Sequence, residues 1–191
     1  STFNSSILNW DVSNVTTMAS MFSGATAFNQ DINPWVTSNV TDMNNMFLNA
    51  TSYNQDMFNW DVSNVLDMSN MFNGASSFNK ALGSWFPSSV TNMSGMFSGA
   101  TSYDQPIVFS IPQVSDMTNF LGTTGGASAV TLSQQNYTFL LVIFAGQSLQ
   151  NGVTFSGGNS TYSTDSAIAS KANIVSGDNW TITDGGVVNY V

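Results

Sequence analysis

The chain has 191 residues, of which 42% are hydrophobic and only 7% are charged, and its eleven acidic residues against two basic ones give a formal net charge of −9. Nucleic-acid binding depends on Lys and Arg that neutralise phosphates, so this charge excludes that class of function, and anionic membrane surfaces are excluded for the same reason. The chain contains neither Cys nor His, which excludes disulfides and the usual zinc sites. No apolar run is long enough to predict a membrane span.

The first 121 residues repeat a unit of 25 residues. The unit has the form V-x-x-M-x-x-M-F-x-x-A-x-x-F-N-Q-D-x-x-x-W-D-V-S-N, and its tryptophans mark the step: Trp10, Trp35, Trp60 and Trp85. A unit this short cannot bury its own apolar side, whereas stacked units cover one another. The repeat therefore predicts a solenoid of about five coils over residues 1–121.

Two local structures are expected inside each unit. The segment M-x-x-M-F-x-x-A has the spacing of one tight helical or 3₁₀ turn. Residues 28–36 and their equivalents are predicted to form a short strand, and the Ser-Asn that precedes Val forms the corner. Equivalent strands of successive coils would then pair in parallel, about 4.8 Å apart.

The unit resembles the Met-Phe-rich form of the BspA-like leucine-rich-repeat surface proteins. The resemblance is carried by W-D-V-S-N-V-T at 10–16 and its counterpart W-D-V-S-N-V at 60–65, by M-x-x-M-F-x-G-A at 18–25, 68–75 and 93–100, and by F-N-Q-D at 28–31. It covers residues 1–121 and implies a leucine-rich-repeat-like solenoid displayed on a cell surface, with an adhesive or structural role and no catalysis. Residues 104–121 depart from the pattern, as expected of the last repeat of a solenoid.

The 25-residue period stops after the glycine-rich break at residues 122–126. Ser133 is a candidate N-cap for a helix with apolar residues at helical spacing, and residues 153–155 are predicted as a strand. Ser163 or Thr164 would cap a second helix that ends near residue 175, before a second strand at residues 180–183. The predicted fold class is therefore an α/β repeat solenoid with parallel short strands, closed by a C-terminal αβαβ capping segment over residues 122–191.

Methionine and aspartate are the side chains that could carry chemistry. The Met-x-x-Met pairs offer thioether ligands for Cu(I), but their phase in the repeat favours a packing role. Asp31 and Asp56 share one repeat position and Asp42 and Asp67 another, so each pair would lie roughly 5 Å apart if those positions fall on paired strands. This separation suits a retaining glycosidase or a Ca²⁺ site. Because no Arg, His or Glu supports either pair, no catalytic residue and no cofactor are predicted, and Ca²⁺ is kept as the alternative.

Asparagine recurs at fixed positions. One column is expected to hydrogen-bond along the stacking axis through its side chains and to fix the register: Asn4, Asn29, Asn54, Asn79 and Asp104. The residues that follow this column, three Gln and Lys80, are expected to point into solvent. Eight N-x-[ST] sequences are glycosylation candidates if the protein is secreted: Asn4, Asn14, Asn39, Asn49, Asn92, Asn136, Asn159 and Asn179.

Two main classes of function fit these observations. The first is an extracellular or cell-surface structural protein that assembles head to tail with copies of itself through the uncapped first coil, at Phe3, Asn4 and Trp10. The second is an adhesin-type module that binds a host protein or a glycan, with Tyr53 and Tyr103 among its contacts. A carbohydrate-active enzyme is the third alternative. Since the chain starts inside a repeat, it is also expected to be a processed product.

Overall fold

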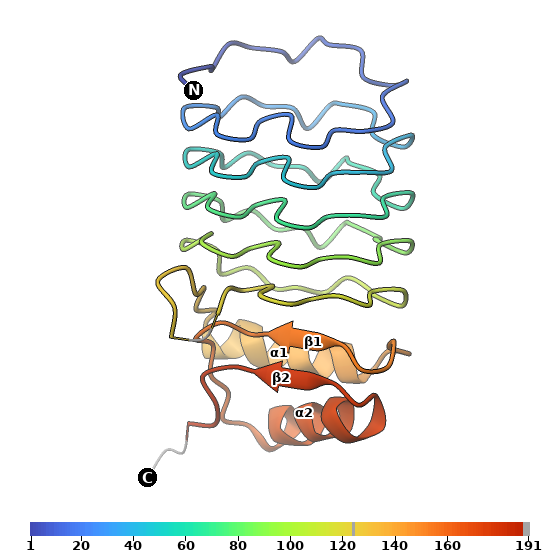
Figure 1. The fold of residues 1–191 in the computed structure, drawn as a ribbon, viewed down its shortest axis with the longest axis vertical. Helices are drawn as coiled ribbons and strands as arrows, with labels where there is room; N and C mark the ends of the chain where they lie inside the picture. The colour runs from blue at the N-terminus through green and yellow to red at the C-terminus, as the bar shows by residue number, and fades with distance from the viewer. Residues whose placement is uncertain (124, 189–191) are drawn as a thin grey trace.

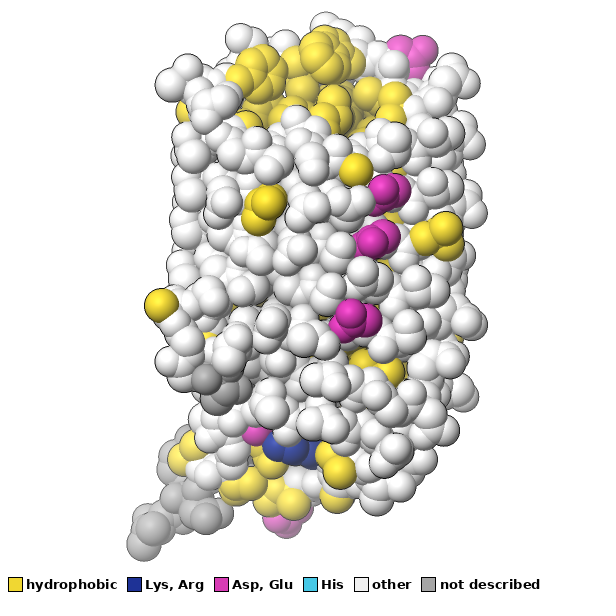
Figure 2. Space-filling view, viewed as in Figure 1, with side chains coloured by type: hydrophobic (Ala, Val, Ile, Leu, Met, Phe, Trp, Pro, Cys, Tyr) yellow, Lys and Arg dark blue, Asp and Glu magenta, His cyan; other side chains and the backbone are white. Residues whose placement is uncertain are grey.

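The computed structural model describes residues 1–123 and 125–188, and in it the chain winds into coils stacked along one axis (Figure 1). The helices and strands of the described residues all lie in the C-terminal segment: α1 Gln134–Ala145, β1 Thr154–Ser156, α2 Asp165–Gly177 and β2 Thr181–Thr183. None of the described helices is long and apolar enough to cross a membrane. Most of the face seen in Figure 2 is polar and uncharged.

One parallel ladder joins the coils. We call residues 15–39, 40–64, 65–89 and 90–113 coils one to four, and coil five begins at Val114. Single parallel bridges link successive coils: Thr17↔Asp42, Asp42↔Asp67, Asp67↔Asn92 and Asn92↔Asp116. The backbone N–H groups of Met18, Ser20 and Phe22 donate to carbonyl oxygens of coil two over 2.8–2.9 Å, and the pattern recurs between the later coils. The Met-rich segment of each coil is thus the part that pairs with the next coil.

The location predicted for the strands was wrong. Residues 28–36 form no strand, and the pairing lies instead in the segment that was predicted to be a 3₁₀ turn. That segment is a series of single turns, because a residue with positive φ interrupts it: Ser20 has φ 59° and its equivalent Asn70 has φ 53°. The left-handed residue turns the backbone so that its N–H and C=O groups form hydrogen bonds with the neighbouring coils, and no helix continues.

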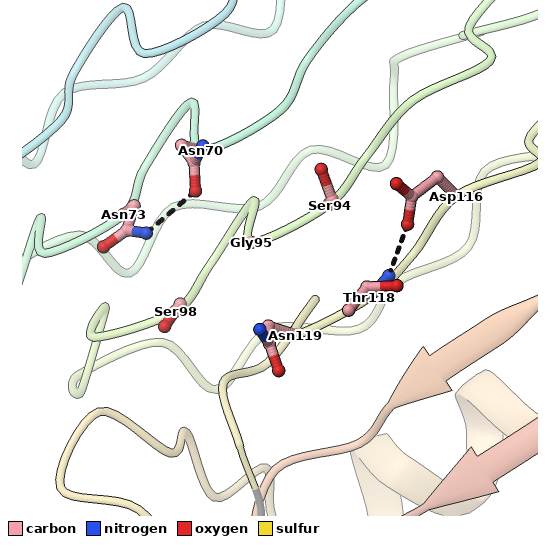
Figure 3. Close-up of a pocket in the computed structure, with 8 residues that line it drawn as sticks. All are labelled: Asn70, Asn73, Ser94, Gly95, Ser98, Asp116, Thr118 and Asn119. Atoms are coloured by element: carbon pink, nitrogen blue, oxygen red, sulfur yellow. Dashed lines mark hydrogen bonds between the residues drawn. The ribbon is translucent and has the colours of Figure 1, made fainter.

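Two columns of left-handed residues run along the stack: Ser20, Asn45, Asn70, Gly95 and Asn119 form one, and Gly24, Asn49, Gly74 and Gly99 form the other. Non-glycine residues other than Asn rarely adopt this conformation, which explains the residue types found there. Asn49 and Asn70 each precede a glycine, and their side chains lie over the next coil: a Cβ on Gly74 would collide with Asn49 Oδ1, and one on Gly95 with Asn70 Oδ1. Figure 3 shows Gly95 in its place between the asparagines of the coils on either side.

The core consists of aromatic columns that run along the stack. Each coil contributes two nearly parallel rings 4.0–4.2 Å apart, as in the pair Phe47 and Tyr53. Rings of successive coils follow at 5.5–6.2 Å, and all of those in coils two to four are buried. The indole N–H of Trp35, Trp60 and Trp85 each donates to a carbonyl oxygen of the preceding coil, which explains why Trp holds this position.

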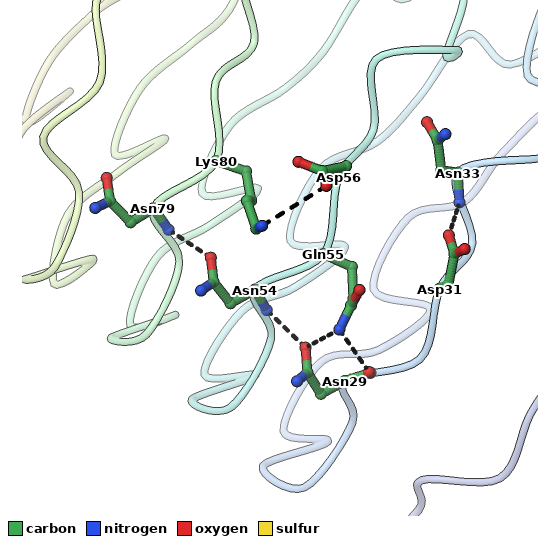
Figure 4. A network of polar contacts seen from close by, with 8 residues as sticks. All are labelled: Asn29, Asp31, Asn33, Asn54, Gln55, Asp56, Asn79 and Lys80. Atoms are coloured by element: carbon green, nitrogen blue, oxygen red, sulfur yellow. Dashed lines mark hydrogen bonds and ion pairs between the residues drawn. The ribbon is translucent and has the colours of Figure 1, made fainter.

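The opposite side of each coil is held by the predicted asparagine column. The side-chain oxygens of Asn29 and Asn54 accept hydrogen bonds of 2.9 and 3.0 Å from the backbone N–H of the next asparagine in the column (Figure 4). The residues beside the column do not simply face solvent: Gln55 Nε2 donates to Asn29 Oδ1 over 3.1 Å, and Lys80 forms a 3.6 Å ion pair with Asp56. These side chains are half-buried, and the three Gln side chains reinforce the column by donating to its side-chain oxygens.

The asparagine column ends at the start of α1. Its last member is Asp104, whose Oδ1 accepts hydrogen bonds from Ser133 N over 2.7 Å and from Asn136 Nδ2 over 2.9 Å. Ser133 is the predicted N-cap, and its hydroxyl accepts from Asn136 N. A carboxylate at a helix N-terminus is favoured by the free N–H groups there, so the change from Asn to Asp suits the change from coil to helix.

The C-terminal segment covers the last coil by extending the stack. Met117 forms a parallel bridge with Phe155 of β1, and β1 pairs in parallel with β2, so that Phe155 lies opposite Ile182. α1 and α2 take the side that the asparagine column occupies in coils one to four, and they pack against each other (Figure 1). The buried side chain of Asp184 links α1 to α2, since it accepts from Tyr137 Oη of α1 over 2.6 Å and from Lys171 Nζ of α2 over 2.9 Å.

Replacing Asn54 by Ala tests the asparagine column. The change leaves the half-buried Asn79 N–H without its acceptor, so the free energy of unfolding is expected to fall by about 1–3 kcal/mol. Urea unfolding followed by tryptophan fluorescence measures it. Asn59→Ala is the control, since the structure gives that exposed side chain no hydrogen bond, and it should change stability by less than about 0.5 kcal/mol. Equal losses in the two variants would contradict the role given to the column.

Candidate functional site

The two ends of the stack are the surfaces on which apolar side chains gather. Figure 2 shows a group of hydrophobic side chains over the N-terminal end. We name it the first-coil face, formed by the exposed side chains Phe3, Leu8, Trp10 and Met21. Phe3 stacks on Phe28 at 5.7 Å with one ring face and is 39% exposed, and Trp10 is 56% exposed.

Of the three residues predicted for an assembly edge, the structure places two outward. Phe3 and Trp10 are exposed on the first-coil face. Asn4 is also exposed, but its Oδ1 is directed to coil one, where it accepts from Asn29 N and Gln30 Nε2 over 2.9 Å. Asn4 therefore belongs to the asparagine column, and its side-chain oxygen is already used within the chain.

The first-coil face also carries a row of backbone acceptors. In coil two, the carbonyl groups of Asp42, Asn44, Met46 and Leu48 accept hydrogen bonds from the coil before. The equivalent carbonyl groups of coil one belong to Thr17, Ala19, Met21 and Ser23. Among the described residues none donates to them, so the ladder at this end has open acceptor positions.

A second open edge lies at the other end of the stack. We name it the last-coil face, formed by β2 and by the exposed side chains Ile168, Val175 and Val187. Thr181 N–H and Thr183 C=O are both paired with the chain around β1. Because neighbouring residues of a strand present their backbone groups to opposite edges, the N–H and C=O groups of Ile182 point away from β1. This edge was not predicted from the sequence; the 27-residue spacing of Phe155 and Ile182 is the signal that would have revealed it.

Asp42 and Asp67 lie side by side on neighbouring coils, but each carboxylate accepts a hydrogen bond from the backbone of its own turn. Asp42 and Asp67 form a parallel bridge. Asp42 Oδ1 accepts from Asn44 N over 2.9 Å, Asp67 Oδ1 accepts from Ser69 N over 2.7 Å, and Asn92 Nδ2 lies 3.3 Å from Asp67 Oδ2. Both carboxylates close local turns, and that of Asp67 also accepts from an amide of the next coil.

The second pair, Asp31 and Asp56, lies on a side of the coil that has no paired strands. Asp31 Oδ1 accepts from Asn33 N over 2.9 Å, and Asp56 faces Lys80 (Figure 4). No group of three or more acidic, His or Cys side chains that could hold a metal occurs in residues 1–123 and 125–188. Calcium at either pair stays a prediction that lacks a third carboxylate ligand.

The methionines lie in the core. Seven of the eight in the Met-x-x-Met pairs are fully or almost fully buried, and only Met21 of the first-coil face is exposed. Their thioethers pack between the aromatic columns and the ladder, as the phase of the repeat predicts.

The glycosylation candidates differ in how accessible their amide nitrogens are. Asn136 Nδ2 donates both of its hydrogens to Asp104, so a glycan on that nitrogen would break the contact that anchors α1. Asn92 and Asn159 are half-buried. Exposed positions are Asn4, Asn14, Asn39, Asn49 and Asn179. Among the described residues, no hydrogen bond engages the side chains of Asn14, Asn49 and Asn179, whereas Asn39 Nδ2 donates to Ser13 O.

The tyrosines proposed as glycan contacts are not on the surface. Tyr53 and Tyr103 are at most 1% exposed, which corrects the prediction that they contact a ligand. Burial raises the pKa of both, and nearby carboxylates (Asp31 and Asp56 for Tyr53, Asp104 for Tyr103) raise it further. Their hydroxyl groups have no hydrogen-bond partner, although the equivalent positions in other coils are Phe. These hydroxyls therefore cost desolvation without a compensating bond.

Two Tyr→Phe changes compare a buried hydroxyl group that has no hydrogen bond with one that donates a hydrogen bond. Tyr53→Phe is expected to leave the free energy of unfolding unchanged or to raise it by about 1 kcal/mol, because it removes an unpaired buried group. Tyr137→Phe should lower it by about 2 kcal/mol, since Tyr137 Oη donates to the buried Asp184 carboxylate. Urea unfolding of both variants measures the difference. A loss of stability in Tyr53→Phe comparable to that in Tyr137→Phe would contradict this account.

The buried tyrosines also predict how stability depends on pH. Desolvation raises the pKa of Tyr53, Tyr103 and Tyr137 in the folded protein. Between the unfolded value of about 10 and these raised values, the folded state holds more protons than the unfolded state, so stability must fall as the pH rises. Urea unfolding should show constant stability from about pH 8 to 9 and a steep loss above about pH 10. Tyrosinate absorbance should rise together with unfolding; ionisation of all tyrosines in the folded protein would contradict the prediction.

Comparison with known proteins places the repeat in a family. No curated protein and no solved structure matches the chain. A family model described as "Mycoplasma protein of unknown function, DUF285" matches residues 1–65 and 34–134. Together these matches span all the coils of the 25-residue repeat and the start of α1. The chain belongs to this DUF285 family.

Proposed function

We propose that this protein is a non-catalytic structural repeat protein of the cell surface that assembles head to tail with copies of itself. The observation that carries the proposal is the single parallel ladder, which keeps one direction from Thr17 to Ile182 and has an open edge in the described residues at each end. In such a contact, β2 of one copy would lie against coil one of the next, in the way that each coil already lies on its neighbour.

The side chains of the two end faces support this contact. Phe3 offers the outer face of its ring at the end of an aromatic column, and Ile168, Val175 and Val187 are exposed at the opposite end. Burying apolar surface at both ends would stabilise the contact by about 25 cal/mol per Å². Because the two faces differ, the contact is heterologous, and a translation along the stacking axis would extend it into a filament.

We further propose that the stack is a leucine-rich-repeat-like solenoid of the BspA-like, Met-Phe-rich type. This assignment is supported by the motif M-x-x-M-F-x-G-A at residues 18–25, 68–75 and 93–100, each copy of which lies on the ladder. The location outside the cell is part of the same proposal. It rests on the resemblance and on a composition in which Ser, Thr and Asn supply the surface polarity in place of charge.

Two variants that each block one face test the head-to-tail contact. Phe3→Asp places a charge on the first-coil face, and Ile182→Pro removes the outward N–H of β2. The unchanged protein is expected to form filaments as its concentration rises, and each variant alone should stay monomeric in sedimentation velocity and electron microscopy. An equal mixture should stop at dimers, because one partner keeps a working first-coil face and the other a working last-coil face.

Phe58→Asp is the matched control, because Phe58 is 59% exposed on coil two and the change adds the same charge. It should assemble as the unchanged protein does. Dimers of Ile182→Pro alone would show a symmetric contact instead, and a monomeric unchanged protein at millimolar concentration would overturn the proposal.

A further inference from the structure

A polar hollow opens on the side of the stack, away from both end faces (Figure 3). It has a volume of about 360 Å³ and lies where the Met-rich segments of coils three, four and five meet. Its floor consists of Ser94, Gly95 and Ser98 of coil four, and Asn70 and Asn119 stand on either side. The hollow exists because coil four carries the smallest residues at these positions, where coil two has Asn44, Asn45 and Leu48.

Several polar atoms around the hollow remain free within the described residues. Asn70 Oδ1 accepts from Asn73 Nδ2 over 2.9 Å, which leaves Asn70 Nδ2 as a donor. Asn119 Oδ1 accepts from Thr123 Oγ1 over 3.1 Å, which leaves Asn119 Nδ2 as a second donor. Asp116 uses Oδ1 for the N–H of Thr118 over 2.9 Å, so Oδ2 is a free acceptor. The hollow thus offers amide donors and a carboxylate acceptor from two different coils.

The chemistry of the lining selects among ligand classes. Asp116 repels anions, and both lysines of the chain are paired elsewhere, Lys80 with Asp56 and Lys171 with Asp184. A metal would need more ligands than the one carboxylate in the lining. No hydrophobic side chain lines the hollow, so apolar ligands gain nothing there. Neutral molecules with many hydroxyl groups can use both the donors and the acceptor.

We propose that this hollow is a binding site for a neutral, polyhydroxylated ligand of the size of a mono- or disaccharide. Its volume lies within the range of small-molecule sites. Without an aromatic side chain for a sugar ring to stack on, affinity comes from hydrogen bonds alone and is therefore weak, with a dissociation constant of about 1 mM. Copies of the site repeated along a filament would compensate by multivalency, but binding at one hollow does not depend on assembly.

Gly95→Asn fills the hollow with little disturbance of the backbone. Gly95 has φ 64°, and Asn adopts the same conformation at the equivalent positions 45, 70 and 119. The new Cβ would meet only the tip of the Asn70 side chain, which can turn aside. Gly24→Asn is the matched control: Gly24 has φ 68° and nothing within 4 Å of an added Cβ, and it lies on coil one. Ser98→Asn, which copies Asn73 of coil three, is a second filling variant.

Saturation-transfer NMR provides the test. The probes are galactose, N-acetylglucosamine and lactose as neutral sugars, N-acetylneuraminic acid as an anion and spermidine as a cation. We expect transfer to at least one neutral sugar, a loss of affinity of at least about tenfold in Gly95→Asn and in Ser98→Asn, and unchanged binding in Gly24→Asn. Thermal unfolding confirms that each variant is folded. Phe3→Asp should bind the sugar as well as the unchanged protein does, which separates this test from that of assembly.

Three outcomes would overturn the proposal. The first is the absence of transfer to every neutral sugar. The second is binding of spermidine alone that disappears in Asp116→Asn, which would make the hollow a weak cation site. The third is an equal loss of sugar binding in Gly24→Asn and Gly95→Asn, which would place the ligand elsewhere on the stack.

Discussion

The hydrogen bond that each asparagine of one column accepts from the backbone N–H of the next coil is the constraint on which the stack depends. It forms only if a step of one coil brings equivalent residues into line, and that step is 25 residues along the chain from Asn4 to Asp104. With the register fixed on this side, the ladder on the Met-rich side and the ring columns between them follow at the same step. A protein with few regular strands and few charged residues is held in one register by side-chain amides that bond to the backbone.

The repeat made the period, the core residues and the asparagine column predictable. The ring and Met positions recur through coils one to four and the Trp position through coils one to three, and a residue that must be buried in one coil must be buried in the next. The predicted caps Ser133 and Thr164 also accept the expected hydrogen bonds, because capping depends only on nearby residues. The side of the unit that forms the ladder was not predictable from apolar spacing. It is set by left-handed residues such as Ser20 and Asn70, and neither hydrophobicity nor period records a positive φ.

Some surface features could also be predicted from the sequence, and others could not. Phe3 and Trp10 were predictable as exposed, because they hold core positions of the repeat with no coil before them in this sequence. Tyr53 and Tyr103 were misplaced, because a hydroxyl group suggests access to water although their ring positions are those of Phe28 and Phe78. The hollow at Gly95 could not be predicted, since it arises from the sizes of residues on three coils that are distant in sequence.

The places of Asn and Gly in the left-handed columns make the order of the units matter. Asn49 needs Gly74 on the following coil, because the Asn49 side chain occupies the space of a Cβ there. In the other column Asn45 is followed by Asn70, so an asparagine there tolerates another on the next coil. If residues 65–89 were excised, Asn45 and Asn49 would lie above Gly95 and Gly99, and the remaining coils could close. If residues 40–64 were instead duplicated, Asn49 would lie above a second Asn49, and the two side chains would compete for one space. Units that look alike in a consensus are therefore not interchangeable, and a gene encoding them can lose or duplicate some of them more readily than others.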